Sequence, residues 1–218
     1  MTELTDGKPA TAAVGDAILI SYEFTDNTKK ASRISVDWPD TGDAILSLSV
    51  GETKQFSGRI KGGRVAPVRA YQADLNADGV PDYTVFTYSG GSGLAGQITY
   101  VTLLLSSPTG YGCVRVLSYD AEFTDLVNIN DHVYLVHTSM IYGEEGKDGR
   151  NHNYWVYNLL KVSGKTLALD NTPDRRFPKW VMYSFLPGHK ETTQLTSEQR
   201  QRLWSEHVKQ NPKDLDGD

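Results

Sequence analysis

The sequence predicts a mainly β protein, with antiparallel sheets in a sandwich or partial propeller-like arrangement and one C-terminal α-helix. Two observations predict this class. Short apolar or alternating runs recur along most of the 218-residue chain, separated by Gly, Asn, Asp and Pro. No helical pattern of roughly 10–15 residues lies between these runs, which argues against βαβ units and a parallel sheet.

The positions of the strands are predicted from the alternation of apolar and polar residues. Apolar residues alternate along 17–24, and again along 46–50, where Leu46, Leu48 and Val50 are separated by serines. Gly51 and Glu52 then turn the chain into 53–60, which predicts a hairpin. Further strands are expected over 65–73, 83–88, 97–106, 112–119, 132–142, 154–162 and 180–185.

One helix is expected near the end of the chain, over about residues 197–210. Thr196 is a candidate N-cap, and Gln199 follows three residues later, as in a capping box. Trp204 and Val208 are four residues apart and share an apolar face. Pro212 ends the pattern.

The domain organisation follows from these elements. Residues 1–14 are expected to be a flexible N-terminal tail. A single all-β domain that includes the helix is expected over 15–211, and 212–218 is expected to be an acidic tail.

Charge and cysteine content exclude several classes of protein. The chain has 22 basic and 27 acidic residues, a formal net charge of −5. That balance argues against a nucleic-acid binder and against adhesion to an anionic membrane. No apolar run approaches about 18 residues, so no transmembrane segment is expected. Cys113 is the single cysteine, so no intrachain disulfide can form, and we expect it to be a small buried thiol.

One motif in the chain points to a specific chemistry. Residues 74–82 have the pattern D-x-N-x-D-G-x-x-D. Gly79 stands where the chain must turn sharply, and the Val80 carbonyl can point inward. Ca²⁺ prefers about 6–8 oxygen ligands, which side chains, one carbonyl and water can supply. The predicted calcium ligands are Asp74, Asn76, Asp78, Asp82 and the Val80 carbonyl. The alternative is an Asp/Asn/Gly-rich turn that holds no ion.

The motif is not an EF-hand, because position 12 is Val85 rather than Glu and β-type residues flank the loop. Residues 73–85, the Gly-rich segment 90–96 and the following 97–103 resemble the FG-GAP or VCBS-type repeat, the calcium loop of integrin α-subunit propellers. That resemblance implies the same five calcium ligands and a loop between two strands. A propeller needs roughly 4–8 blades, and one loop is present, so only the calcium site is carried over.

Two other polar segments are candidates for a site. The Gly-rich stretch 89–96 reads as a flexible hairpin connection that could border a ligand site. In 142–155, Glu144, Glu145, Asp148 and His152 could form a second metal or carboxylate site, although a solvated loop fits the spacing better. In the strand that follows, Trp155 and Tyr157 should lie on the face opposite Tyr154. Such aromatic faces bind sugars or proteins when exposed.

The leading functional hypothesis is a calcium-binding, non-enzymatic binding or interaction module, with an unknown protein or glycan as its ligand. The N-terminus lacks the basic and apolar regions of a signal peptide. We expect a secreted, periplasmic or cell-surface protein whose export signal has been removed, because a weak calcium site would stay empty in the cytosol. The alternatives are a glycan-acting hydrolase, with its site near 89–96 and 143–153, and a protein inhibitor or immunity-type partner.

Overall fold

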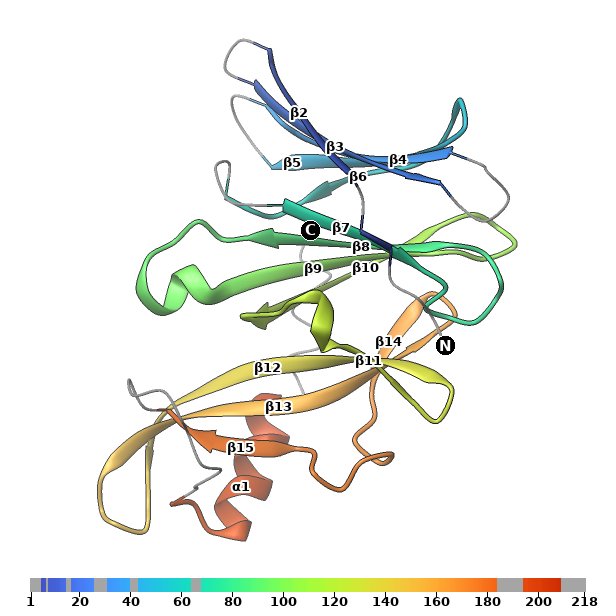
Figure 1. The fold of residues 1–218 in the computed structure, drawn as a ribbon. Coiled ribbons are helices and arrows are strands. Elements are labelled where there is room, and N and C mark those ends of the chain that lie inside the picture. The colour runs from blue at the N-terminus through green and yellow to red at the C-terminus, as the bar shows by residue number, and fades with distance from the viewer. Residues whose placement is uncertain are drawn as a thin grey trace. The chain divides into compact units, whose positions relative to one another are not determined.

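The computed structural model describes residues 5–6, 8–14, 17–25, 31–39, 43–63, 68–183 and 194–208. These residues form a mainly β structure with three antiparallel sheets and one short C-terminal α-helix (Figure 1). The fold class predicted from the sequence is confirmed. None of the helices described is long and apolar enough to cross a membrane.

The chain divides into two compact units. Unit 1 comprises Met1–Leu117 with Ser163–Thr166, and unit 2 comprises Ser118–Val162 with Leu167–Asp218. The single domain expected over 15–211 therefore contains two units.

The first sheet of unit 1 is a meander in which each strand pairs with the next in the chain. The strand and hairpin expected over 17–24, 46–50 and 53–60 are present, and Gly51 turns the hairpin with φ 59°. The strands are β2 (Lys8–Val14), β3 (Ala17–Thr25), β4 (Ala31–Trp38), β5 (Ala44–Val50) and β6 (Thr53–Ile60).

Two features of this unit differ from the prediction. Residues 5–6 and 8–14, expected in a flexible tail, form β1 (Thr5–Asp6) and β2, which are edge strands. Edge pairing uses backbone groups, so it needs no strong apolar pattern. Strand β4 was not predicted, although Ile34, Val36 and Trp38 alternate along it and are buried.

The second sheet of unit 1 contains β1, β7 (Val68–Ala73), β8 (Asp82–Tyr88), β9 (Ile98–Leu105) and β10 (Gly112–Tyr119). Residues 65–67 of the strand expected over 65–73 lie outside the described residues. The Gly-rich stretch contains a short 3₁₀ turn, η1 (Gly93–Gln97). The segment 74–81 links β7 to β8, so the predicted loop does lie between two strands.

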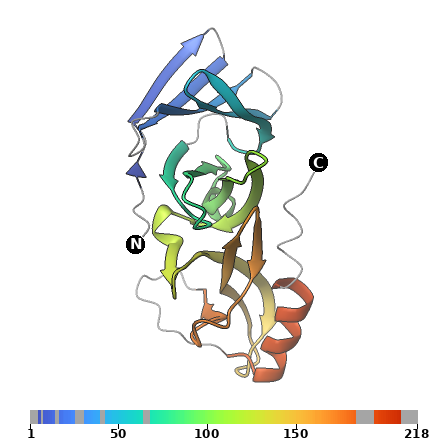
Figure 2. The same cartoon turned by 90° about the vertical axis from the view of Figure 1, so that its right-hand side faces the viewer.

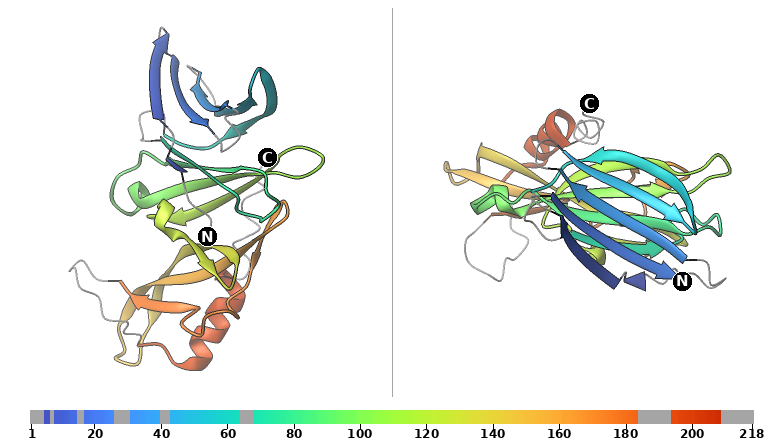
Figure 3. Two further views of the ribbon diagram at one scale, coloured as in Figure 1. Left: turned by 45° about the vertical axis from the view of Figure 1, so that its right-hand side comes forward. Right: turned by 90° about the horizontal axis from the view of Figure 1, so that it is seen from above.

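The two sheets of unit 1 form a sandwich over one hydrophobic core (Figure 3). Side chains from the first sheet meet Val68, Ala70, Tyr83, Val85 and Leu104 of the second. Cys113 is partly buried and packs against this core. The residues contributed by the first sheet are Tyr22, Phe24, Ile34, Val36, Trp38, Ala44, Leu46, Leu48 and Ile60.

Unit 2 is one sheet with α1 against a face of it (Figure 2). Its core joins Ile141, Tyr154, Val156 and Trp180 of the sheet to Leu195 and Leu203. A 3₁₀ turn, η2 (Phe123–Asp125), precedes the sheet. The strands are β11 (Leu126–Ile129), β12 (His132–Glu145), β13 (Asn151–Ser163), β14 (Thr166–Leu169) and β15 (Lys179–Met182).

The C-terminal helix begins as predicted and ends earlier. Thr196 Oγ1 accepts a hydrogen bond from the Gln199 amide at 3.1 Å, and Gln199 Oε1 accepts one from the Thr196 amide at 2.8 Å. The α-helix α1 covers Ser197–Leu203, and a π-helical turn, η3 (Trp204–Val208), continues it. Residues 209–210 and the expected acidic tail lie outside the described residues.

The sandwich core of unit 1 can be tested with two neighbouring residues on β5. Leu46 is fully buried, whereas Ile45 on the opposite face is 39% exposed. We expect Leu46→Ala to lower the free energy of unfolding by about 2–5 kcal/mol, measured by denaturant unfolding. Ile45→Ala should cost much less. Equal losses for the two variants would contradict the assignment of the core face.

Candidate metal centre

The acidic loop, residues 74–82, reverses the chain between two paired strands. Its ends meet where Ala73 of β7 pairs with Asp82 of β8. Gly79 has φ 81°, as its place in the motif predicts. Ala77 also has a positive φ, 62°, which is rare for a residue with a Cβ atom. The loop backbone is therefore held in a conformation that its hydrogen bonds must maintain.

Asp82 is the buried centre of the loop, with no solvent exposure. Its Oδ2 accepts hydrogen bonds from the amides of Leu75 at 2.7 Å and Asn76 at 3.1 Å. Its Oδ1 accepts one from the amide of Ser106 at 2.6 Å. Burial raises the pKa of Asp82 to about 6, and the hydrogen bonds from Ser106, Leu75 and Asn76 act in the opposite direction.

Asp74 and Asn76 direct their oxygens at the same backbone amide. Asp74 Oδ1 and Asn76 Oδ1 each lie 3.1 Å from the Asp78 nitrogen, and Asp74 Oδ2 lies 3.0 Å from the Gly79 nitrogen. Because both Oδ1 atoms contact one nitrogen, the two side chains lie close together on one side of the loop. The structure thus brings the first two predicted ligands together.

Asp78 is exposed and faces the end of β9. Its Oδ1 accepts a hydrogen bond from the Val80 amide at 2.8 Å. The Ser106 hydroxyl donates to the same carboxylate, at 3.0 Å from Oδ1 and 2.8 Å from Oδ2. Asn76 Nδ2 donates to the Ser106 carbonyl at 3.0 Å and lies 3.4 Å from the Gly164 carbonyl.

Ser106 is the site residue that sequence reasoning missed. Through its amide, hydroxyl and carbonyl it contacts three of the predicted ligands. The register of β8 and β9, in which Tyr83 pairs with Leu104, brings it beside Asp82. The strand predicted over 97–106 includes Ser106, but the pattern of apolar residues does not show which strand pairs with it. Nothing in the sequence therefore indicates that Ser106 lies beside Asp82.

The predicted ligand atoms of the loop suit calcium, because all of them are oxygens and three of the side chains are negatively charged carboxylates. In the described part of the chain, no ion pair involves Asp74, Asp78 or Asp82. Within those same residues, no three His, Cys, Asp or Glu side chains are grouped so that they could hold a metal ion. Asp82 directs both of its oxygens at backbone amides. A carboxylate oxygen can accept two hydrogen bonds. The oxygens of Asp74 and the Oδ1 atom of Asp82 therefore each keep a lone pair that could bind a cation.

In the polar segment 142–155 of unit 2, Glu144 lies opposite His152 in the pairing of β12 with β13, but both of these side chains already have partners. Glu144 forms an ion pair with Arg202 at 3.3 Å, and Asp148 pairs with His152 at 2.9 Å. The hydrogen bond from His152 holds the pKa of Asp148 below its usual value. Glu145 contributes its carbonyl, which accepts a hydrogen bond from Gln199. These contacts favour the solvated-loop interpretation over a second metal site.

Unit 2 also presents an aromatic row, formed by Tyr119, Tyr142, Trp155 and Tyr183. The ring centroids of Tyr119 and Trp155 are 5.0 Å apart, and those of Trp155 and Tyr183 are 5.8 Å apart. The hydroxyls of Tyr119 and Tyr142 are 3.1 Å apart, and Tyr142 is 55% exposed. Trp155 and Tyr154 lie on opposite faces of β13, as predicted, since Tyr154 is fully buried and Trp155 is not.

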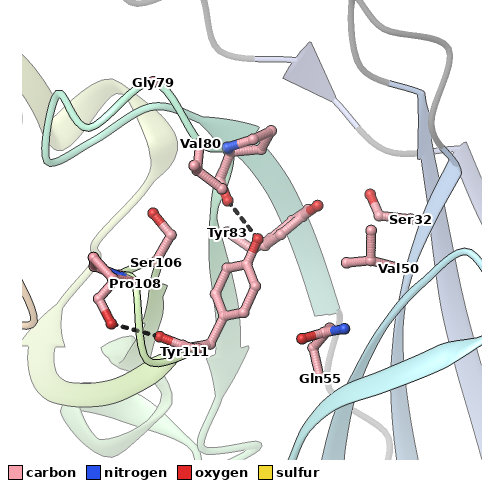
Figure 4. Close-up of a pocket in the computed structure, with 12 residues that line it drawn as sticks. Ser32, Val50, Gln55, Gly79, Val80, Tyr83, Ser106, Pro108 and Tyr111 are labelled. Atoms are coloured by element: carbon pink, nitrogen blue, oxygen red, sulfur yellow. Dashed lines mark hydrogen bonds between the residues drawn. The ribbon is translucent and has the colours of Figure 1, made fainter.

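A cavity of about 500 Å³ lies beside the acidic loop in unit 1 (Figure 4). Gly79, Val80 and Pro81 of the loop line it, together with residues of β4, β5, β6 and the segment that joins β9 to β10. The Tyr111 hydroxyl donates a hydrogen bond to the Pro81 carbonyl at 2.9 Å. The loop is thus one wall of a cavity as well as a candidate cation site.

Comparison with protein-family models, with curated proteins and with solved structures finds no match for this chain. The resemblance of the acidic loop to the FG-GAP or VCBS-type repeat therefore stays a prediction, and function must be argued from the residues themselves.

The role of Asp82 can be tested in the metal-free protein. An asparagine has one acceptor oxygen in place of two, so Asp82→Asn would leave at least one of the three amides facing an NH₂ group. We expect a loss of about 1–3 kcal/mol in the free energy of unfolding in the presence of EDTA. Asp43→Asn, at an exposed position, is the control. If both variants unfold like the wild type, Asp82 does not hold the loop.

Proposed function

We propose that this protein is a calcium-stabilised, non-enzymatic binding module. The ion would be held by Asp74, Asn76, Asp78, the Val80 carbonyl and Asp82, the last through the remaining capacity of its Oδ1 atom. When bound, Ca²⁺ would supply positive charge to a loop with three carboxylates and would fix the loop backbone against β9.

The observation that carries the proposal is the uncompensated charge of the acidic loop. Three carboxylates lie within nine residues, and no basic side chain in the described structure pairs with them. Like charges at short range repel, and the loop also holds Ala77 in a left-handed conformation. A divalent cation would relieve the repulsion. The convergence of Asp74 and Asn76 on one amide supports the same site.

Binding is better supported than catalysis. The described residues that line the cavity beside the loop are Ser, Gln, Tyr, Pro, Gly and Val, and among them there is no carboxylate or imidazole to act as acid or base. Asp82 has a perturbed pKa, but its oxygens are directed at backbone amides. The aromatic row of unit 2 is a second surface of the kind that binds proteins or glycans.

The proposal places the protein outside the cytosol, in the periplasm, at the cell surface or in the medium. A site built from one short loop should bind with a dissociation constant of about 10⁻⁴–10⁻³ M, as in extracellular modules. Such a site is filled only where free calcium is millimolar.

Calcium should raise the melting temperature of the metal-stripped protein. At a tenfold excess over the dissociation constant, mass action adds about 1.4 kcal/mol of stability. For a chain of this size we expect a rise of about 3–6 °C, measured by a thermal melt in millimolar CaCl₂. The same concentration of MgCl₂ should have little effect, because Mg²⁺ demands a tighter octahedral geometry.

Asp78→Ala should abolish this calcium-dependent rise, because it removes a central ligand that is exposed rather than buried. Asp43→Ala removes an exposed carboxylate away from the loop and should keep the full rise. The proposal is wrong if the wild type shows no calcium response, or if Asp78→Ala responds as strongly as Asp43→Ala.

A further inference from the structure

The cavity beside the acidic loop is lined by neutral groups. Its walls come from both sheets of the sandwich and from the segment between β9 and β10. Apart from the tyrosines, no described residue that lines the cavity has an ionisable side chain. The lining residues are Ser32, Val50, Gln55, Gly79, Val80, Pro81, Tyr83, Ser106, Ser107, Pro108, Gly110 and Tyr111. Since none of the described residues that line the cavity is basic and the Asp78 carboxylate is held by Ser106, an anionic ligand is disfavoured.

Ser32 supplies an unused polar group. Its side chain is buried, with 5% exposure, and its hydroxyl forms no hydrogen bond within the described structure. A buried hydroxyl without a hydrogen-bond partner destabilises the folded protein, and such groups are rare in native structures. Figure 4 shows Ser32 on the side of the cavity opposite the acidic loop. A ligand hydroxyl that reached this side chain would give it the partner that the described part of the chain does not supply.

Tyr111 and Tyr83 form an aromatic wall. Their ring centroids are 5.9 Å apart, and Tyr83 in turn packs edge-on against Phe24 at 5.5 Å. Burial raises the pKa of Tyr111 above its usual value, so the phenol stays protonated and donates to Pro81. Its oxygen can still accept a hydrogen bond. Rigid tyrosine rings offer an apolar face and a polar tip at a small entropic cost.

Two other polar side chains that line the cavity can hydrogen-bond a ligand. The Gln55 amide can both donate and accept a hydrogen bond, whereas the Ser106 hydroxyl, which donates to Asp78, can only accept one. The Ser107 hydroxyl donates to the Gly110 carbonyl at 2.8 Å, accepts from the Thr109 amide at 3.2 Å and lies 3.1 Å from the Thr109 hydroxyl, so it is already fully used. The Gln55 side chain lies at the edge of the cavity formed by β6 and is exposed (Figure 4). A set of hydroxyl and amide groups beside an aromatic wall matches a molecule that has many hydroxyls on one side and a C–H face on the other.

We propose that this cavity binds a neutral saccharide, whose hydroxyls pair with Ser32 and Gln55 and whose C–H face lies against Tyr111. This inference names the ligand class of the binding module proposed above and rests on that function. Gly79, Val80, Pro81 and Ser106 belong both to the cavity and to the acidic loop or its contacts. Calcium should therefore strengthen saccharide binding by holding that wall in place.

The test is ligand-observed saturation-transfer NMR on the full chain. The probes are glucose, galactose, mannose and N-acetylglucosamine, with cellobiose, lactose and chitobiose as disaccharides. Glucuronic acid and glucose phosphate are the charged comparisons. We expect at least one neutral saccharide to bind with a millimolar or smaller dissociation constant, and the charged sugars to bind more weakly.

Ser32→Ala is the sharpest variant. It removes a hydroxyl that has no partner in the described structure, so it should leave the melting temperature unchanged or higher. It should nevertheless raise the dissociation constant about fivefold, the loss expected for one neutral hydrogen bond. Ser35→Ala, three residues along β4 and on the opposite face, should bind like the wild type. Tyr111→Ala should weaken binding at least about tenfold.

Three results would overturn the inference. They are no signal from any neutral saccharide, wild-type affinity in both Ser32→Ala and Tyr111→Ala, and loss of binding in Tyr142→Ala, which would place the sugar on the aromatic row. Titration in CaCl₂ and in EDTA separates the two proposals. Binding that is equal in both solutions, with no calcium effect on the melt, would reject the calcium site and keep the saccharide site.

Discussion

The buried carboxylate of Asp82 is the interaction on which the acidic loop depends. It ties three backbone amides together, two from the loop and one from the end of β9. These bonds fix Leu75 and Asn76 at one end of the loop and Ser106 across the sheet. The cost of burying the charge is visible in the raised pKa of Asp82. The geometry of Asp74, Asn76 and Asp78 follows from where this anchor holds the backbone.

Much of the fold could be predicted because a strand that is buried on one face has apolar residues at every second position of its sequence. Short stretches of sequence were enough to predict the hairpin at Gly51, the capping box at Thr196 and the position of the acidic loop between two strands. Strand β2 was missed because an edge strand pairs through its backbone. Ser106 was missed because its place at the site depends on which strands pair, and a single sequence does not encode that pairing as a local pattern.

The proposed metal site and the proposed saccharide site share one structural element. The loop that carries Asp74, Asn76 and Asp78 also lines the cavity, through Val80 and Pro81. Ser106 connects the two by donating to Asp78 and by lining the cavity. A cation bound by this loop would therefore act on the cavity by restricting the loop backbone, without direct contact with the ligand.

The most direct test of the calcium site is an NMR titration of the metal-stripped protein with CaCl₂, observed at the backbone amides. Our account predicts saturable shifts at Leu75, Asn76, Asp78, Gly79 and Ser106, the amides bonded to the proposed ligands. Amides of 144–148 in unit 2 should not respond. Unchanged loop amides at millimolar Ca²⁺, or shifts confined to 144–148, would contradict the account and leave residues 74–82 as an ordinary turn.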